Sequence, residues 1–307
     1  MPKPNFFIVG APKCGTSSLG YYLSQHPDIF MAPKELQFFG SDLKTVDNFR
    51  RPPDKAKTSL EVYLNHFKDA QRESRIGDNS VFYLYSKKAA EEIHAFDPNS
   101  KIIIMLRHPI DMLESLHSQL IYDAVESETD FLKALELEKD RKVGRAIPKT
   151  AVFPQILFYR EVALYSRQVK RYLDIFEKDQ VLVILFDELK SSTESVYRKT
   201  LGFLEIDASY QADLSPKNPN TVSKFPKIKR LLVNPPQWLQ PVAKPLANNI
   251  GIRNLIRDLD LKLNTAHKKR ASVTNLQKAN LYHEFSQDIQ HLEEILKRDL
   301  STWKHQY

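Results

Sequence analysis

The chain has 307 residues, a formal net charge of +7, 42% hydrophobic residues and one cysteine, Cys14. A lone cysteine excludes an intramolecular disulfide and argues against a cysteine-based zinc site, and the nine histidines form no HExxH or H-x-H pattern, so we expect no metal. No apolar run approaches the roughly 18 residues that a membrane-spanning helix needs. The positive charge favours anionic ligands without naming one.

The first predicted element is a buried strand over residues 6–9, followed by a turn and a helix that begins at Thr16. Gly10 and Gly15 bound the turn. The first N–H groups of a helix have no partner within the helix and carry the positive end of its dipole, so such a turn suits a phosphate or sulfate. Some glycine-rich turns of this kind bind nothing, and that alternative stays open on the loop alone.

The spacing of this turn resembles the nucleotide P-loop, G-x-x-x-x-G-K-[ST]. Thr16 stands where the P-loop has its lysine, and the only lysine of the turn is Lys13. A kinase or nucleotide hydrolase would therefore lack its central charge. The stretch PKCGTSSL instead resembles the 5′-phosphosulfate loop of sulfotransferases, which use 3′-phosphoadenosine 5′-phosphosulfate (PAPS). The resemblance implies that the cosubstrate is bound by Lys13, Cys14, Gly15, Thr16, Ser17 and Ser18.

Cys14 has two interpretations. A helix N-terminus lowers the pKa of a thiol and can make it reactive. A small residue that fills a tight turn is the simpler interpretation, and we favour it.

Residues 24–40 read as an irregular segment that contains one carboxylate, Glu35, after Lys34 and before Phe38 and Phe39. Apolar packing and the nearby cation would compete to set the pKa of Glu35, which could then act as a general base. The alternative is an exposed glutamate paired with Lys34. The stretch PKELQFF resembles the K-E-x-x-F-F segment of glycan sulfotransferases, where the matching glutamate takes the proton of the acceptor hydroxyl. Gln37 replaces a frequent family histidine and cannot titrate.

A helix is predicted from Ser59 to Arg72. The following stretch, IGDNSVFYLYS, aligns with a family segment that has a Glu-Lys or Asp-Ala pair, and here it reads Asp78, Asn79, Ser80. Some glycan enzymes place a lysine beside the acceptor at this point. Its absence leaves the acceptor type open.

Residues 101–106, KIIIML, form a continuous apolar run typical of a parallel strand covered on both faces. Arg107 ends the strand, and a helix begins around Pro109. The arginine fork and the hydroxyl of Ser115, eight residues later, could hold one phosphate. This spacing resembles the family's 3′-phosphate motif. The competing interpretation is a capping ion pair between Arg107 and Asp111.

Further along, we predict helices over 129–141 and 156–176 and a second parallel strand over 180–186, with a loop and helix start after it. Residues 207–275 are rich in proline and read as an irregular lid or acceptor region, in which Lys224 is a candidate contact to the cosubstrate. Residues 276–300 read as an amphipathic packing helix.

Together these elements predict a single α/β domain over 1–307, with a P-loop-like three-layer fold and a central parallel sheet flanked by helices. The resemblance implies transfer of a sulfuryl group from PAPS to an acceptor hydroxyl of a sugar, glycolipid or other alcohol, with release of 3′-phosphoadenosine 5′-phosphate (PAP). Lys13 would stabilise the leaving oxygen and Glu35 would act as base. The rival classes are a P-loop kinase or hydrolase and a non-catalytic nucleotide-binding protein.

No motif for nucleic-acid binding is found, although peripheral contact with a membrane through the proline-rich region fits the sequence. The strand predicted from Phe6 leaves no room for a signal peptide before it, so we expect a soluble cytoplasmic protein.

Overall fold

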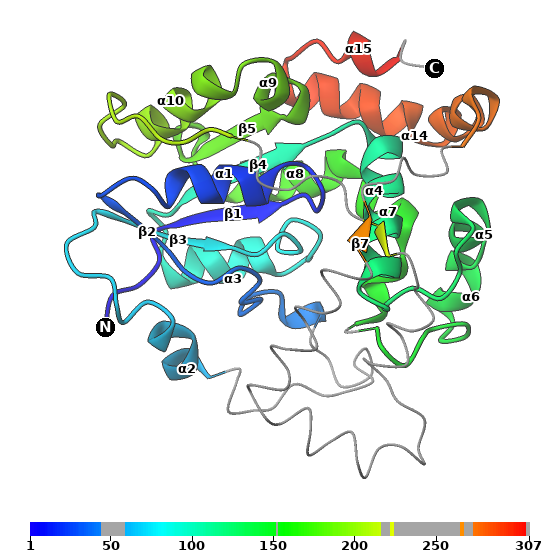
Figure 1. Ribbon diagram of the computed structural model, residues 1–307, viewed down its shortest axis with the longest axis horizontal. Coiled ribbons are helices and arrows are strands. Elements are labelled where there is room, and N and C mark those ends of the chain that lie inside the picture. Colours follow the sequence, from blue (N-terminus) through cyan, green and yellow to red (C-terminus); the bar gives the residue numbers. More distant parts are fainter. Residues whose placement is uncertain (44–58, 152, 216–221, 224–264, 267–272, 305–307) are drawn as a thin grey trace. The chain divides into compact units, whose positions relative to one another are not determined.

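A computed structural model describes residues 1–43, 59–151, 153–215, 222–223, 265–266 and 273–304 (Figure 1). Contacts within the chain define two compact units. Unit 1 comprises residues 1–112, 160–218 and 275–307, and unit 2 comprises residues 113–159 and 219–274. The prediction of one domain over the whole chain stays a prediction.

Unit 1 is built on a five-stranded sheet in the order β2-β3-β1-β4-β5, in which every neighbouring pair is parallel. Its strands are β1 (Phe6–Gly10), β2 (Ile29–Met31), β3 (Arg75–Asn79), β4 (Lys101–Leu106) and β5 (Val181–Leu185). The strands predicted over 6–9, 101–106 and 180–186 are thereby confirmed as β1, β4 and β5, while β2 and β3 were not predicted.

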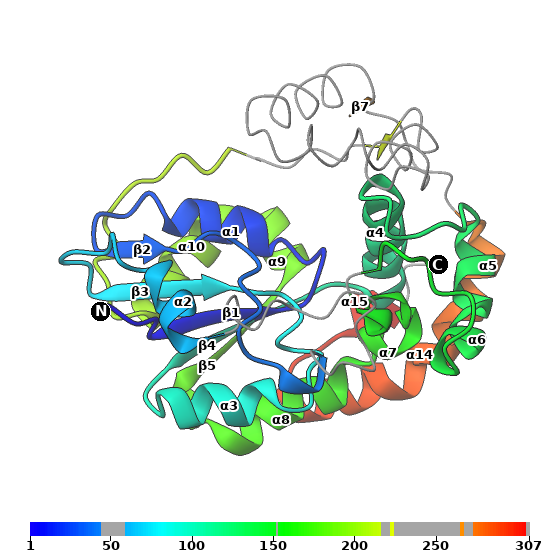
Figure 2. The same cartoon turned by 90° about the horizontal axis from the view of Figure 1, so that it is seen from below.

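Helices cover both faces of this sheet (Figures 1 and 2). One face carries α1 (Thr16–Leu23) and α10 (Thr193–Phe203), which contact each other. The other face carries α3 (Ala89–Phe96), α8 (Tyr165–Ile175) and α14 (Asn275–Leu296), with α8 packed between the other two. Because both faces are covered, β1 is buried along its whole length. The three-layer α/β fold with a central parallel sheet is confirmed.

Several helices differ from their predicted bounds. The helix predicted over 156–176 is three pieces, η4 (Pro154–Leu157), α7 (Tyr159–Ala163) and α8. The chain leaves helical geometry at Leu164, and the side-chain amide of Gln168 donates to the carbonyls of Glu161, Val162 and Leu164 at 2.9–3.2 Å. This amide satisfies the carbonyl groups that the break frees, so the interruption costs little.

Other bounds change less. The helix predicted from Ser59 ends early, as α2 (Leu60–Asn65), and the helix over 129–141 divides into α5 (Phe131–Glu136) and α6 (Glu138–Lys142). The loop predicted after β5 is already helical, as α9 (Phe186–Ser191). The predicted starts of α1 and of α4 (Pro109–Tyr122) are confirmed, and the C-terminal helix is α14, followed by the short α15 (Ser301–Lys304).

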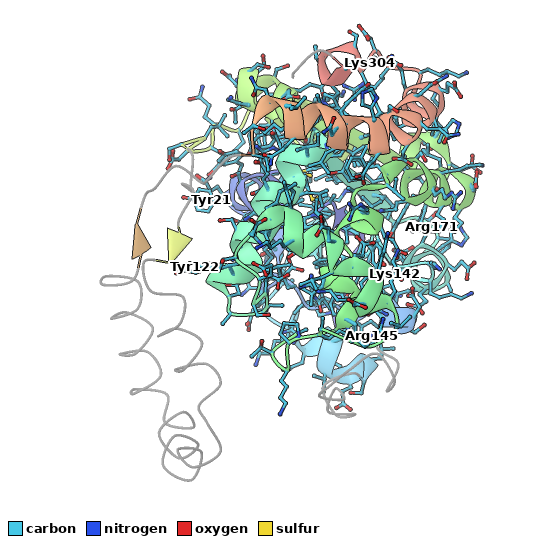
Figure 3. All side chains as sticks on the ribbon, turned by 90° about the vertical axis from the view of Figure 1, so that its right-hand side faces the viewer. Tyr21, Tyr122, Lys142, Arg145, Arg171 and Lys304 are labelled. Carbon is cyan, nitrogen blue, oxygen red and sulfur yellow. The ribbon has the colours of Figure 1, made fainter. Side chains whose placement is uncertain are left out.

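Unit 2 contains the later part of α4, α5, α6 and an antiparallel pair, β6 (Val222–Ser223) with β7 (Thr265–Ala266). Its core holds an ion pair between the fully buried carboxylate of Glu126 and Arg141 at 2.9 Å, and Tyr159 donates to the same carboxylate. Lys142 and Arg145 lie at the surface of the unit (Figure 3). Most of the predicted lid region 207–275, including Lys224, lies outside the described residues. In the described ranges, no helix is long and apolar enough to cross a membrane.

Among the glycines that the structure describes, Gly77 in β3 leaves the least room for a Cβ atom. This residue pairs with Phe6 of β1 and Met31 of β2, and a Cβ atom there would lie 2.3 Å from Phe6 Cζ and 2.6 Å from Met31 Sδ. A side chain of any size at position 77 would therefore displace the side chains of Phe6 and Met31.

We expect Gly77→Ala to lower the free energy of unfolding by about 1–3 kcal/mol, the usual cost of overpacking a core. Gly202→Ala is the control, because a Cβ at this α10 position meets nothing within 4 Å. It should leave stability unchanged or raise it by about 0.5–1 kcal/mol. Urea unfolding curves measure both, and equal stability of the two variants would contradict the packing described for β3.

Candidate active site

The ends of β1 and β4 bring the two predicted anion motifs to one edge of the sheet. These strands are parallel neighbours, and the backbone N–H of Ala11, just past β1, donates to the carbonyl of Met105 at 2.6 Å. The chain order also reverses here, since β3 lies on one side of β1 and β4 on the other. In open parallel sheets, ligands bind outside the carboxyl ends of the strands at such a switch point.

The turn after β1 leads directly into the N-terminus of α1. Lys13 and Gly15 have positive φ angles of 62° and 91°, and the carbonyl of Gly15 accepts the N–H groups of Ser18 and Leu19 at 3.0 and 3.1 Å. Among the described residues, no side chain caps α1, and its first turn contains no acidic residue. The positive end of the α1 dipole and its first N–H groups thus face the turn, an arrangement that suits an anion.

One aromatic ring joins this turn to Arg107. A Cβ at Gly15 would lie 2.8 Å from Leu189 Cδ2 and 3.2 Å from Phe186 Cδ2, so the turn packs directly on α9. The guanidinium carbon of Arg107 lies 4.7 Å from the centre of the same Phe186 ring. Gly15 and Arg107 therefore share one neighbour, as expected if the two motifs bind parts of one ligand.

Arg107 also forms the ion pair that was its competing interpretation. Its Nη2 lies 3.6 Å from a carboxylate oxygen of Asp111, and both side chains are mostly buried. A guanidinium has five N–H donors, so this contact does not exhaust its capacity. Ser115 is a buried residue of α4 that belongs to unit 2. Its joint action with Arg107 on one phosphate stays a prediction.

Cys14 is fully buried within the turn. Its thiol lies 3.4 Å from the carbonyl of Pro12 and 4.0 Å from the Tyr165 hydroxyl. Burial raises the pKa of the thiol to about 12, outweighing the positive charge of Arg107. The geometry favours the small-residue interpretation over a reactive thiol.

The segment that carries Glu35 runs along the end of β3. Backbone N–H groups of Ala32 and Glu35 donate to the carbonyls of Gly77 and Asn79, both at 3.0 Å. The Glu35 side chain is about one third exposed (34%), and one of its oxygens accepts the N–H of Val81 at 3.3 Å. Its φ angle of 63° is unusual for a residue other than glycine. Such a conformation is found where surrounding contacts hold a functional side chain in place.

Lys34 connects Glu35 to the first turn of α1. Its ammonium lies 2.5 Å from the hydroxyl of Ser17 and 3.6 Å from the carboxylate of Glu35. From the sequence, Lys34 was considered only as an ion-pair partner of Glu35. The contact with Ser17 places it beside the candidate anion site, and its position next to Glu35 in PKELQFF was the available signal.

Burial and charge act in opposite directions on this pair. Burial raises the pKa of Glu35 above the ordinary value of 4.5, while Lys34 and a hydrogen bond from Val81 lower it and the charge of Asp78 raises it further. Burial also lowers the pKa of Lys34 despite the neighbouring carboxylate. A carboxylate whose pKa is raised in this way is a better proton acceptor than an exposed one.

Asn79 stands where the resemblance described for the sequence suggests a lysine. Its side-chain amide donates to the carbonyl of Thr16 at 3.0 Å, within the first turn of α1. Two side chains therefore connect the Glu35 region to the start of α1. Asn79 contacts the backbone carbonyl of Thr16, and Lys34 contacts the hydroxyl of Ser17.

The chain is similar to known proteins in sequence and in fold. Residues 3–229 match the family model of the sulfotransferase domain. A crystal structure of a sulfotransferase from Alicyclobacillus acidocaldarius is 30% identical, with a TM-score of 0.71 over 99% of this chain and 100% of that one. Human carbohydrate sulfotransferase 15 is 25% identical over 85% of this chain and 52% of its own length. The membrane-associated sulfotransferase kil1 of Dictyostelium discoideum is 23% identical, over 75% and 62%. The chain thus spans only about half the length of the first of these curated relatives.

The burial of Cys14 makes a direct prediction for thiol chemistry. We expect iodoacetamide at about pH 8 to leave the folded protein unmodified, because only a thiolate reacts and a buried thiol of raised pKa stays protonated. The same protein in guanidinium chloride should gain one adduct, since Cys14 is the only cysteine. Intact-mass spectrometry reads both states, and rapid labelling of the folded protein would contradict the buried position.

Proposed function

The chain belongs to the sulfotransferase domain family, and on this basis we propose that it transfers a sulfuryl group from PAPS to an acceptor hydroxyl and releases PAP. The observation that carries the proposal is the contact of Lys34 with both Ser17 and Glu35. This contact supports the proposal because Lys34 joins the carboxylate of Glu35, the proposed base, to the first turn of the helix that would hold the sulfated end of the donor.

The donor would lie across the ends of β1 and β4. Backbone N–H groups and hydroxyls of the α1 start would hold its 5′-phosphosulfate through Gly15, Thr16, Ser17 and Ser18. Arg107, whose guanidinium carbon lies 4.7 Å from the centre of the shared Phe186 ring, would bind the 3′-phosphate with its planar fork. Two separated anion contacts of this kind suit a nucleotide with phosphates at both ends.

The transfer itself is a displacement at sulfur. The acceptor oxygen forms a new S–O bond while its proton passes to the carboxylate of Glu35, and the bond from sulfur to the 5′-phosphate oxygen breaks. Negative charge grows on the leaving oxygen, and Lys13 would stabilise it there. Lys34, between Ser17 and Glu35, would add positive charge on the acceptor side.

We propose a sugar hydroxyl as the acceptor. The support is the carbohydrate sulfotransferase among the relatives and the carboxylate base, which matches the need to activate a neutral alcohol. Asn79 argues against an acceptor contact at its own position, because its amide is bonded to Thr16. A lipid or other small alcohol is the alternative outcome of an acceptor screen with labelled PAPS.

Glu35→Gln tests the base directly. We expect turnover to fall by about 10²–10⁴-fold, the usual contribution of a positioned general base. PAP affinity and thermal stability should stay close to those of the unchanged protein, because glutamine keeps the shape of the side chain. An unchanged rate of sulfuryl transfer would remove Glu35 from the mechanism.

The pH profile gives a second measurement of the same group. The base works only when deprotonated, so the rate should fall as pH decreases through a pKa that lies above 4.5. This acidic limb should be absent from any residual activity of Glu35→Gln.

Arg107→Ala tests the 3′-phosphate contact. We expect PAP to bind about 10- to 100-fold more weakly, since a hydrogen bond to a charged group contributes about 1.5–3 kcal/mol. Adenosine 5′-phosphate, which lacks the 3′-phosphate, should lose little affinity. Arg198→Ala is the control, because this arginine pairs with Glu194 on the surface of α10.

Isothermal titration calorimetry measures the affinities of PAP and adenosine 5′-phosphate for the unchanged protein and for the Arg107→Ala and Arg198→Ala variants. Equal losses for both nucleotides would contradict the assignment of Arg107. A thermal-shift comparison of PAP with ATP–Mg on the unchanged protein separates a sulfotransferase from a P-loop kinase.

A further inference from the structure

A buried carboxylate lies behind the segment that carries Glu35. Asp78, near the end of β3, has no exposed surface. One of its oxygens accepts the hydroxyls of Tyr63 and Tyr83, both at 2.8 Å, and the other accepts the hydroxyl of Ser80 at 2.7 Å. Three hydroxyl donors thus converge on a single carboxylate.

Two of these hydroxyls also accept hydrogen bonds from the backbone that follows Glu35. The Ser80 oxygen accepts the N–H of Gln37 at 3.1 Å, and the Tyr83 oxygen accepts the N–H of Phe38 at 2.9 Å. A hydroxyl has one proton to donate and lone pairs to accept with. Because both hydroxyls donate their hydrogen bond to Asp78, their lone pairs are left to accept the two backbone N–H groups.

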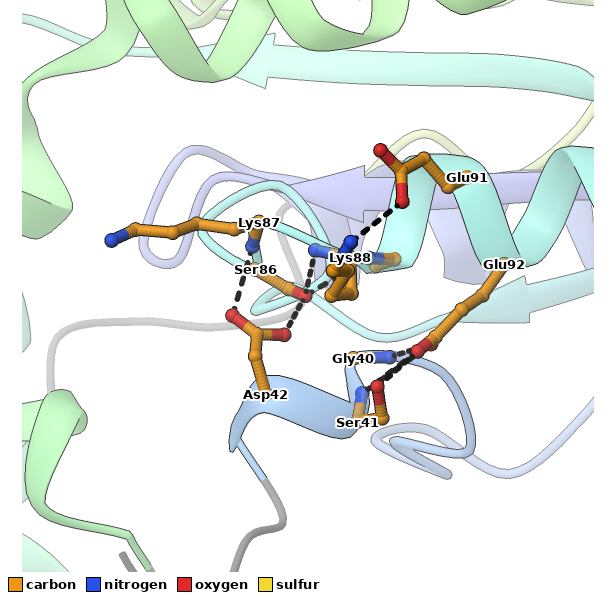
Figure 4. A network of polar contacts seen from close by, with 9 residues as sticks. Gly40, Ser41, Asp42, Ser86, Lys87, Lys88, Glu91 and Glu92 are labelled. Carbon is orange, nitrogen blue, oxygen red and sulfur yellow. Dashed lines mark hydrogen bonds and ion pairs between the residues drawn. The ribbon is translucent and has the colours of Figure 1, made fainter.

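Hydrogen bonds to two further carboxylates hold the same segment at residues 40–42 (Figure 4). The carboxylate of Glu92 in α3 accepts the N–H groups of Gly40 at 2.6 Å and Ser41 at 3.2 Å. The carboxylate of Asp42 accepts the hydroxyl of Ser86 at 2.5 Å and the N–H of Lys87 at 2.9 Å. Figure 4 shows the carboxylate of Glu92 turned toward Gly40 and Ser41, and the carboxylate of Asp42 turned toward Ser86 and Lys87.

The backbone between Glu35 and these contacts needs external support. Glu35 and Gln37 have φ angles of 63° and 49°, a region that side chains disfavour. A segment in this conformation persists only where its surroundings hold it. The hydroxyls bound to Asp78 contact the two residues that directly follow Leu36, which makes them the nearest restraint on the C-terminal side of Glu35.

We propose that Asp78 is a positioning residue for the sulfuryl transfer: through the hydroxyls of Ser80 and Tyr83 it fixes the backbone of Gln37 and Phe38 and thereby the carboxylate of Glu35. The proposal rests on the proposed function for its effect on catalysis. The restraint itself is a property of the fold and can be measured without any substrate.

The two tyrosines offer a matched pair of variants. Both rings are buried, and both hydroxyls donate to the same oxygen of Asp78 at 2.8 Å. Only the Tyr83 hydroxyl also accepts the N–H of Phe38. Tyr83→Phe and Tyr63→Phe therefore remove equivalent hydrogen bonds to Asp78, but only Tyr83→Phe also removes the hydrogen bond to Phe38, one of the two contacts with the segment that follows Glu35.

Amide hydrogen exchange is the first readout. We expect the Phe38 amide to exchange faster in Tyr83→Phe, and to keep its rate in Tyr63→Phe, at similar melting temperatures of the two variants. Equal exchange of this amide in both variants would overturn the proposal, whether or not the protein transfers sulfate.

Kinetics with PAPS provide the second readout. We expect kcat of Tyr83→Phe to fall by at least about 10-fold, since small displacements of a reacting group are costly. The KM for PAPS should stay unchanged, and Tyr63→Phe should keep both values. Faster exchange at Phe38 without a loss of kcat would also overturn the proposal. Absence of any transfer by the unchanged protein would instead contradict the proposed function and leave the exchange result to stand by itself.

Asp78→Asn adds a pH profile that a purely structural role would not change. The charged groups that act on Glu35 are Lys34 on its own segment and Asp78 on β3. Asp78 raises the pKa of Glu35, so its neutral replacement should move the acidic limb of the rate to lower pH. An acidic limb that stays in place would contradict the coupling between Asp78 and Glu35.

Discussion

The parallel pairing of β1 with β3 on one side and β4 on the other is the constraint on which the candidate site depends. Because the three strands run in the same direction, their carboxyl ends lie at one edge of the sheet. The turn before α1 follows β1, the Asp78–Ser80 stretch ends β3, and Arg107 follows β4. Three short stretches that are far apart in sequence are thereby placed around one another before any side chain contributes.

Charge is distributed unevenly at this edge. The start of α1 contributes the positive end of its dipole, and Lys13, Lys34 and Arg107 add positive charges. Glu35 adds a negative charge, and Lys34 contacts both its carboxylate and Ser17 in the first turn of α1. Burial shifts the pKa of Glu35 and of Lys34 toward each other, because it disfavours the charged form of both groups. A raised pKa of Glu35 fits the role of base proposed for it.

Local patterns in the sequence were sufficient for the parts of this site that depend on neighbouring residues. The apolar runs predicted β1 and β4, and the glycine spacing predicted the turn between β1 and α1. That this turn and the residues after β4 bind anions stays a prediction. The strand β3 was missed because its sequence, RIGDN, contains glycine, aspartate and asparagine, which favour turns. Its burial comes from pairing with β1 and β2, which a single-sequence pattern does not contain. The contact of Gly15 and Arg107 with Phe186, and the contact of Tyr63 with Asp78, were equally beyond reach, because they depend on the packing of separate elements.

Gln37 and Asn79 are neutral at positions where the resemblance suggests a histidine and a lysine, and the two have a common physical consequence. A histidine at position 37 would add a second titrating group beside Glu35, whereas the Gln37 amide supplies only a hydrogen bond to that carboxylate. A lysine at position 79 would add a cation where the Asn79 amide instead joins β3 to the carbonyl of Thr16. With both positions neutral, the charges that act on Glu35 are those of Lys34 and the buried Asp78. The pKa of the proposed base is therefore raised first by burial and is then adjusted by one cation and one anion that the fold itself holds in place. Both charged residues are open to substitution.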